Sequence, residues 1–211
     1  MAVIILFDLD GTLYRTHETG LPAFREICNR NGIELTPQKE AFLLYTTTDS
    51  FLRKYAPDMD SGQRAAFVHE LKWKEIEAVK EHGRLFDGIL DMLETLAQSG
   101  VAMAICGLGS KEYIEAVLEH CGIAHYFKAV YHRIDGLTKA QVLKTALSDM
   151  RLEPNLCIMV GDSVTDLTAA KENGLPFIGV SYGYGADGIS DADVIVQNAA
   201  QLQAEIFRYL M

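Results

Sequence analysis

Short apolar runs, separated by longer stretches of mixed polarity, set the pattern of this chain. The first run, Val3 to Phe7, is continuous, rich in β-branched residues and followed at once by Asp and Gly, a pattern typical of a strand buried on both faces. Further runs with the length of a strand lie at 101–106, 129–131, 157–160, 177–180 and 194–196. The pattern therefore predicts six strands.

Between these runs the apolar residues recur at helical spacing. Stretches at 89–97, 113–121 and 142–150 place apolar side chains three or four positions apart, as an amphipathic helix requires. Strand and helix thus alternate with short connections, which is the arrangement that produces a parallel sheet covered by helices. We expect an α/β fold of this kind.

The segment from about residue 15 to residue 81 interrupts the alternation, because it has helical spacing and no convincing strand. Turn signals at Asn31-Gly32, Thr36-Pro37, Ala56-Pro57 and Ser61-Gly62 divide it into three or four helices. Residues 15–80 hold ten acidic and ten basic side chains, so the segment is neutral. We expect two domains: an α/β core formed by 1–14 with 82–211, and a helical insertion at 15–81.

Composition narrows the possible partners and the compartment. The 211 residues carry a formal charge of −10, and no block of Lys or Arg supplies the positive field that gathers nucleic acid or an anionic membrane. The N-terminal apolar run has no basic residues before it and is too short to cross a bilayer. The four cysteines are scattered without a CxxC pair, which favours free thiols in the cytoplasm. We expect no nucleic-acid partner and no membrane partner.

Acidic residues gather where two of the predicted strands end. Asp8 and Asp10 follow the first strand in the string DLDGTL, and Asp162 and Asp166 follow the fourth in GDSVTD. Asp166 alone could cap the helix after it, but Asp162 stands directly behind a glycine at the strand tip. Parallel strands carry their functional residues at their carboxyl ends, where these carboxylates would repel one another unless a cation lay among them. Oxygen ligands of this type suit Mg²⁺.

The two strings, with Lys139 between them, resemble the haloacid dehalogenase-like hydrolase superfamily. The resemblance covers the whole α/β part, including Ser181 to Gly185, and it implies a Rossmann-like three-layer core. The helical insertion is similar to the type 1 cap of phosphoglycolate phosphatase-like members. What the resemblance implies in function is a Mg²⁺-dependent phosphatase acting on a small phosphorylated substrate.

The resemblance also implies roles for individual residues. Asp8 would attack phosphorus to form an aspartyl-phosphate, and Asp10 would act as general acid and then as general base. Mg²⁺ would be held by the carboxylates of Asp8 and Asp162 and by the backbone carbonyl of Asp10. Lys139 would contact the phosphate or Asp8, and Asp166 would orient Lys139 or a metal-bound water. On the residues alone, a solvated lysine at a helix start remains an alternative for Lys139.

One position departs from the family pattern. Its second motif ends a strand with a Ser or Thr that donates a hydroxyl to the phosphate, whereas here Gly107 takes that place in the string CGLGS. Either the backbone N–H groups of this turn, at Gly107 and Leu108 and with the help of Ser110, bind the phosphate, or the site binds without efficient turnover. Three activities therefore stay open: phosphatase, phosphomutase of the β-phosphoglucomutase type, and a catalytically reduced phospho-ligand-binding protein.

Three further features are expected from the residues. Thr12 would support the loop after the first strand by hydrogen bonding. Hinges between core and insertion are expected at Tyr14-Arg15 and Gly83-Arg84. Substrate choice would belong to the insertion, and the lone Trp73 reads as a packed residue there. The protein is expected to be a monomer or a homodimer. Residues for substrate choice are offered as candidates: Thr46, Thr47, Thr48, Arg53, Lys72 and Lys74.

Overall fold

The structure is a computed structural model that describes residues 3–43 and 47–210. The chain divides into two compact units, one formed by Met1–Arg15 with Arg84–Met211 and the other by Thr16–Gly83. The two borders lie within one or two residues of the predicted ones. Each unit is described by itself.

The first unit is built on a six-stranded sheet in which every pair of neighbouring strands is parallel. The order across the sheet is β3-β2-β1-β4-β5-β6, so β1 lies between β2 and β4. All six predicted strands are present, which confirms the predicted α/β fold. Their bounds are β1 Ile4–Phe7, β2 Ala102–Cys106, β3 Val130–Tyr131, β4 Cys157–Gly161, β5 Phe177–Val180 and β6 Val194–Val196.

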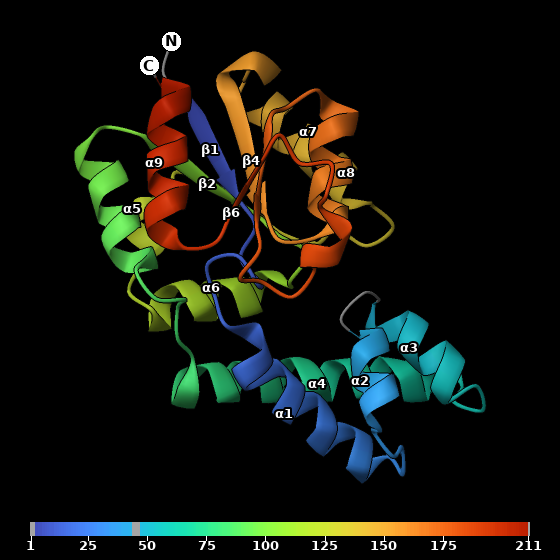
Figure 1. Ribbon diagram of the computed structural model, residues 1–211. Helices are drawn as coiled ribbons and strands as arrows, with labels where there is room; N and C mark the ends of the chain where they lie inside the picture. The colour runs from blue at the N-terminus through green and yellow to red at the C-terminus, as the bar shows by residue number, and fades with distance from the viewer. Residues whose placement is uncertain (1–2, 44–46, 211) are drawn as a thin grey trace. The chain divides into compact units, whose positions relative to one another are not determined.

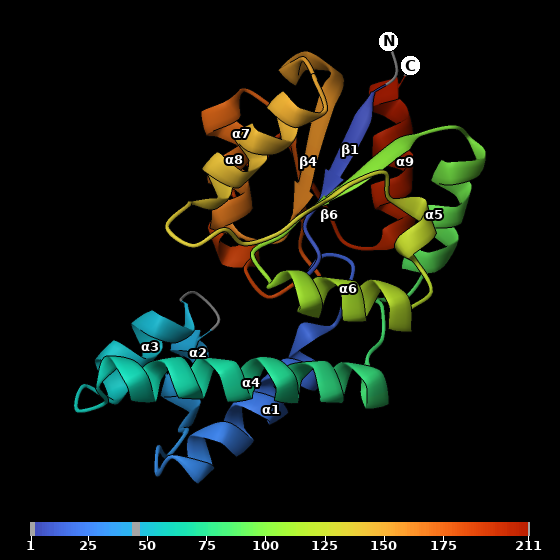
Figure 2. The same ribbon diagram turned by 180° about the vertical axis from the view of Figure 1, so that it is seen from behind.

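Helices cover both faces of this sheet, giving three layers. Figures 1 and 2 show α7 and α8 on one face and α5 and α9 on the other. The chain alternates between strands and these helices, as the apolar spacing predicts. The helices of this unit are α5 Ile89–Gln98, α6 Lys111–His120, α7 Lys139–Asp149, α8 Val164–Asn173 and α9 Ala199–Leu210, with 3₁₀ turns η1 Ala124–Tyr126, η2 Pro154–Leu156 and η3 Ala186–Gly188.

Alternate residues of each strand supply the two sides of the core, because successive side chains of a strand point to opposite faces. Leu6, Ala104 and Met159 pack in one cluster with Leu143 of α7 and Leu167 of α8. The side chains that point to the opposite face of the sheet are also buried, among them Ile5, Phe7 and Ile105. A sheet buried on both faces explains why its strands read as continuous apolar runs.

The described residues of the second unit form four helices inserted between β1 and β2, within the predicted range of three or four. They are α1 Thr16–Arg30, α2 Pro37–Leu43, α3 Thr48–Tyr55 and α4 Ser61–His82. Their core is aromatic: the ring of Phe24 on α1 packs edge-on against Phe51 of α3, at 4.9 Å between centroids, and against Phe67 of α4, at 5.7 Å. Within the described residues, no helix has the length and apolar character needed to span a bilayer.

The two chain segments that lead out of and back into the α/β unit are joined to each other. The backbone N–H of Arg15 donates to the carbonyl of Arg84 (3.1 Å), and that of Phe86 donates to the carbonyl of Leu13 (3.0 Å). An ion pair between Arg15 and Asp87 (2.8 Å) adds a side-chain contact. The proposed hinge positions thus lie beside a paired stretch of backbone, and their motion stays a prediction.

Candidate active site

The ends of four adjacent strands bring the predicted site residues together. In a parallel sheet all carboxyl ends lie at one edge, and the order β2-β1-β4-β5 places four loops side by side there. These loops begin with Gly107 after β2, Asp8 after β1, Asp162 near the end of β4 and Ser181 after β5. The sequence spreads these positions over 174 residues, and the topology makes them neighbours.

The loop after β1 is a compact turn that holds Asp8 in line with the strand. The backbone N–H of Asp8 still pairs with the carbonyl of Val160 on β4 (2.8 Å). The N–H groups of Leu13 and Tyr14 both donate to the carbonyl of Leu9 (2.9 Å each), which closes the turn. Gly11 has a φ of +77°, a left-handed conformation that glycine adopts without strain. Asp8 is buried in this arrangement.

Thr12 supports the loop through its backbone, not through its side chain. Its N–H donates to Leu9 (3.3 Å), and its carbonyl accepts a hydrogen bond from the hydroxyl of Tyr182 (3.0 Å). The Thr12 hydroxyl is fully buried and has no hydrogen-bond partner among the residues that the structure describes. Thr12 therefore makes the expected hydrogen bonds to the loop, but with its backbone N–H and carbonyl and not with its side-chain hydroxyl.

Asp162 is fixed by the loop that follows β5. One of its carboxylate oxygens, Oδ2, accepts hydrogen bonds from the backbone N–H groups of Tyr184 (2.7 Å) and Gly185 (3.2 Å). A Cβ added to Gly183 would collide with the side chain of Asp162 and with the carbonyl of Gly11. Glycine at 183 thus lets three loops meet at Asp162. In the sequence analysis, Ser181 to Gly185 entered only as part of the family resemblance, and no role was predicted for this loop.

Asp166 combines the two roles that the sequence left as alternatives. It caps α8, because its Oδ2 accepts from the N–H of Ser163 (3.1 Å) and from the Ser163 hydroxyl (2.6 Å). Its other oxygen, Oδ1, forms an ion pair with the Nζ of Lys139. A Cβ on Gly161 would collide with the Asp166 side chain, so that glycine makes room for it. The carboxylate of Asp166 thus stabilises the first turn of α8 and also pairs with Lys139.

Lys139, the lysine that the sequence offers as a site candidate, is buried and not solvated. It is the first residue of α7, after a capping box in which the Thr138 hydroxyl accepts from the N–H of Gln141 (3.3 Å). Its side chain is only 4% exposed, and its Nζ contacts both Asp8 and Asp166. The alternative of a surface lysine is therefore wrong. Lys144, five residues further along the same helix, is by contrast exposed.

The electrostatics of the site follow from burial among like charges. Burial raises the pKa of Asp8 well above its ordinary value, and the neighbouring carboxylates, first of all Asp166, act in the same direction against the opposing charge of Lys139. Burial and then Asp166 raise the pKa of Asp162 to about 6. For Lys139, burial lowers the pKa, but Asp166 and Asp8 outweigh this effect and raise it. A further cation would relieve the repulsion among the carboxylates.

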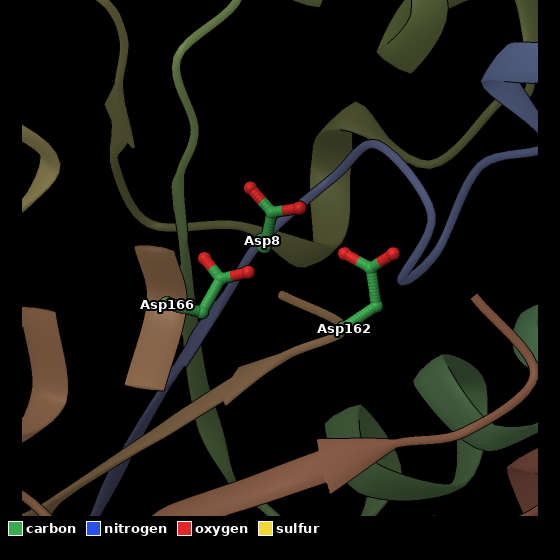
Figure 3. Close-up of side chains that lie close together, drawn as sticks. All are labelled: Asp8, Asp162 and Asp166. Atoms are coloured by element: carbon green, nitrogen blue, oxygen red, sulfur yellow. The ribbon is translucent and has the colours of Figure 1, made fainter. Parts of the chain in front are cut away.

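Three of these carboxylates form a group that could hold a metal ion. One oxygen from each of Asp8, Asp162 and Asp166 lies within 4.8 Å of the others, and all three residues are buried. Figure 3 shows the three side chains close together, Asp8 from the end of β1, Asp162 from the end of β4 and Asp166 from the start of α8. An all-oxygen donor set fits a hard divalent cation. The side chain of Asp10 is not in this group of described residues; it accepts a hydrogen bond from the hydroxyl of Tyr113 (2.8 Å).

The turn after β2 is only partly the phosphate cradle that the sequence suggested. The N–H of Gly107 donates to the carbonyl of Tyr131 (2.9 Å), so it is used in the sheet. The hydroxyl of Ser110 caps α6 by accepting from the N–H of Tyr113 (3.3 Å). Two of the groups that the sequence suggested for phosphate, the N–H of Gly107 and the hydroxyl of Ser110, thus already have partners within the protein, and phosphate binding by this turn stays a prediction. The N–H of Gly107 is occupied because the hydrogen bonding between β2 and β3 continues one residue beyond Cys106, the last residue of β2.

The candidates in the insertion have ordinary local partners. Arg53 pairs with Asp49 (2.6 Å), and Lys74 with Glu77 (2.7 Å) and Glu26 (3.2 Å). Lys72 lies over the ring of Trp73, at 5.0 Å from its centroid. Thr46 lies outside the described residues, and Thr47 caps α3 by accepting from Ser50 (3.2 Å).

Trp73 corrects an expectation. It is 51% exposed, whereas the sequence analysis predicted a packed side chain. Its Nε1–H donates to the Nε2 of His69 one turn earlier on α4 (3.1 Å). The helix places it outside the aromatic core that Phe24, Phe51 and Phe67 form.

The comparisons with known proteins agree with this geometry. Residues 5–180 match the family described as haloacid dehalogenase-like hydrolase. A 5'-nucleotidase of Pseudomonas aeruginosa is 29% identical over 188 residues, which cover 87% of this chain and 84% of that protein. A phosphoglycolate phosphatase of Agrobacterium fabrum is 25% identical, with 100% and 95% of the two chains covered. The crystal structure of a predicted phosphatase from Clostridium acetobutylicum superposes with a TM-score of 0.85 at 25% identity, covering 99% of each chain.

The chain belongs to the haloacid dehalogenase-like hydrolase family, because the match spans most of its length. The predicted family and the predicted fold, with a helical insertion between β1 and β2, are thereby confirmed. The individual roles of the site residues are taken up next as proposals.

Proposed function

We propose that this protein is a Mg²⁺-dependent phosphatase that hydrolyses the phosphate monoester of a small metabolite through an aspartyl-phosphate on Asp8. Relatives named as a 5'-nucleotidase and as phosphoglycolate phosphatases support the class of phosphoric monoester hydrolase. The observation that carries the proposal is the buried ion pair of Lys139 with both Asp8 and Asp166, next to Asp162. In this proposal the negative oxygens hold a cation, the positive amine binds a phosphate and the carboxylate of Asp8 attacks.

Asp8 is the nucleophile of this proposal. It stands at the end of the central strand, with its backbone paired to β4, so the carboxylate is held in place before a substrate arrives. Attack by one of its oxygens on phosphorus forms the aspartyl-phosphate and releases an alcohol. Attack by water on phosphorus then breaks the bond to Asp8 and releases inorganic phosphate.

Asp10 moves the protons. It gives a proton to the leaving oxygen in the first step and takes one from the attacking water in the second, so that it returns to its starting state. Its place two residues after the nucleophile, just before the turn at Gly11, puts an acid and a nucleophile on one short loop.

Lys139 and Asp166 hold the charges of the site. The amine of Lys139 favours the ionised form of Asp8 through a charged contact and offers a positive charge to the phosphate oxygens. Asp166 fixes the amine in position through Oδ1 while its other oxygen stays on the helix cap. Mg²⁺ when bound would be held by Asp8, Asp162 and the Asp10 carbonyl, and it would neutralise charge that develops on the transferred phosphoryl group.

The experiment is release of inorganic phosphate from a panel of phosphorylated metabolites and from p-nitrophenyl phosphate by the purified protein with Mg²⁺. We expect turnover with Mg²⁺, loss of turnover with EDTA, and no release from Asp8→Asn at any substrate concentration. Asp149→Asn, an exposed aspartate on α7, is the matched control and should keep the full rate. The absence of phosphate release from the whole panel would overturn the proposal.

The same panel separates the other two candidates. A mutase would convert a sugar phosphate into an isomer without net release of phosphate, and a phospho-ligand-binding protein would bind phosphorylated compounds without turning them over. The oligomeric state, monomer or homodimer, and the cytoplasmic location stay predictions. The four cysteines are free thiols, and three of them are buried.

A further inference from the structure

The start of α6 carries a tyrosine whose direction is fixed by its surroundings. Tyr113 is the third residue of the helix, and its backbone N–H is held by the capping hydroxyl of Ser110 (3.3 Å). The residue is buried. A capped helix start and a buried ring leave the phenol little freedom.

The turn before α6 is shaped to admit this ring. A Cβ added to Gly109 would be 2.8 Å from Cδ1 of Tyr113, closer than real Cβ contacts allow, and 3.1 Å from Cγ1 of Ile114, which is tighter than most of them. A Cβ added to Gly107, in contrast, would meet its nearest atom at 3.4 Å, an ordinary contact distance. Of these two glycines, only Gly109 is thus required by packing, and what it makes room for is Tyr113.

The hydroxyl of Tyr113 contacts the side chain of Asp10. It donates to Oδ1 of Asp10 at 2.8 Å, although the two residues are 103 positions apart in the chain. Because the carbonyl oxygen of a carboxylic acid is a better acceptor than its hydroxyl oxygen, this hydrogen bond at Oδ1 favours a proton of Asp10 on Oδ2. The contact also restricts rotation of the carboxyl group about its bond to Cβ.

We propose that Tyr113 is a positioning residue for Asp10 that holds its Oδ1, so that Oδ2 faces the leaving oxygen. This inference rests on the proposed phosphatase function. In the first step, an oxygen of Asp8 forms a bond to phosphorus and the bond from phosphorus to the leaving oxygen breaks. The electron pair of the broken bond goes to the leaving oxygen, which takes the proton from Oδ2 of Asp10. Misplacing that oxygen slows proton transfer without removing the acid.

The substitution Tyr113→Phe tests the proposal because it keeps the ring and removes only the hydroxyl. The probes are substituted phenyl phosphates of similar size, from p-nitrophenyl phosphate to phenyl phosphate. The nitrophenolate departs without needing a proton, whereas the more basic phenolate needs one. We expect kcat/KM to fall on the order of tenfold for phenyl phosphate and much less for p-nitrophenyl phosphate.

Tyr182→Phe is the matched control. The hydroxyl of Tyr182 also donates to the loop after β1, but to the backbone carbonyl of Thr12 (3.0 Å) and not to a reacting group. Any loss of kcat/KM in this variant should be the same for both substrates. Thermal unfolding of both variants shows whether they are folded.

The outcomes separate the inference from the function on which it rests. If Tyr113→Phe lowers kcat/KM by the same factor for both phenyl phosphates, or leaves both unchanged, the positioning role is overturned while the phosphatase stands. If the unaltered protein releases no phosphate from these compounds or from the metabolite panel, the proposed function itself fails. A larger loss for phenyl phosphate, absent in Tyr182→Phe, supports the positioning role.

Discussion

Gly107 lies directly beside Asp8: a Cβ on Gly107 would be 3.9 Å from Oδ1 of Asp8. Its nearest neighbour would be Cδ1 of Ile114 at 3.4 Å, so a small side chain fits at this position. The resemblance to the family places a hydroxyl residue there. The glycine therefore leaves out a donor where space for one exists.

We expect Gly107→Ser to raise kcat/KM for phosphate release. Loss of one donor of this type costs about 10²–10³ in rate in other enzymes, so restoring one should give a gain of roughly tenfold or more. Gly107→Ala is the control, because it adds the Cβ without the hydroxyl and should give no gain. A rate with serine no higher than with alanine would contradict the expectation that a hydroxyl at position 107 serves the phosphate.

Removal of the Lys139 amine should destabilise the protein. Lys139→Met leaves the carboxylates of Asp8 and Asp166 buried without their cation, and breaking a buried pair in this way costs about 3–5 kcal/mol. The measurement is the free energy of unfolding from urea denaturation without Mg²⁺. Lys144→Met, on the exposed side of the same helix, should leave it unchanged. Equal stability of the two variants would contradict a structural role for the buried pair.

Mg²⁺ should raise the melting temperature through the carboxylate group. A ligand at 100 times its Kd adds about 2.7 kcal/mol, which corresponds to roughly 5–10 °C for a chain of this size. Asp162→Asn removes a charge from the group and should abolish most of the shift. Asp149→Asn should keep it, since that residue is exposed on α7. A shift in Asp162→Asn as large as in the unaltered protein would place the cation elsewhere.

Gly183→Ala should damage the site through steric overlap. The new Cβ would collide with the side chain of Asp162 and with the carbonyl of Gly11, so the loops must separate. Overpacking of this kind costs about 1–3 kcal/mol, and the displaced Asp162 should also weaken the thermal response to Mg²⁺. Differential scanning fluorimetry with and without Mg²⁺ measures both effects. Gly107→Ala, which adds a Cβ where there is room, should leave both nearly unchanged.

Local patterns were enough to predict the elements of the fold. Apolar runs such as Val3 to Phe7 marked strands, because a sheet covered on both faces needs apolar side chains at every position. The helical spacing of 15–81 marked the insertion. The strings DLDGTL and GDSVTD placed four aspartates at strand ends, and Asp8, Asp162 and Asp166 lie together in the structure. The resemblance to the family added Lys139, which no local pattern distinguishes from a surface lysine.

The sequence by itself thus determined which chemical groups this protein holds and at which strand ends, since periodicity and turn residues are local properties. Only the tertiary structure decided how those groups are held: Asp166 shared between a helix cap and Lys139, Asp162 bound by the N–H groups of Tyr184 and Gly185, and Asp10 joined to Tyr113. Most of these contacts join residues that are far apart in the chain, and their geometry depends on the packing of whole elements. Such packing leaves no periodic signal in the sequence.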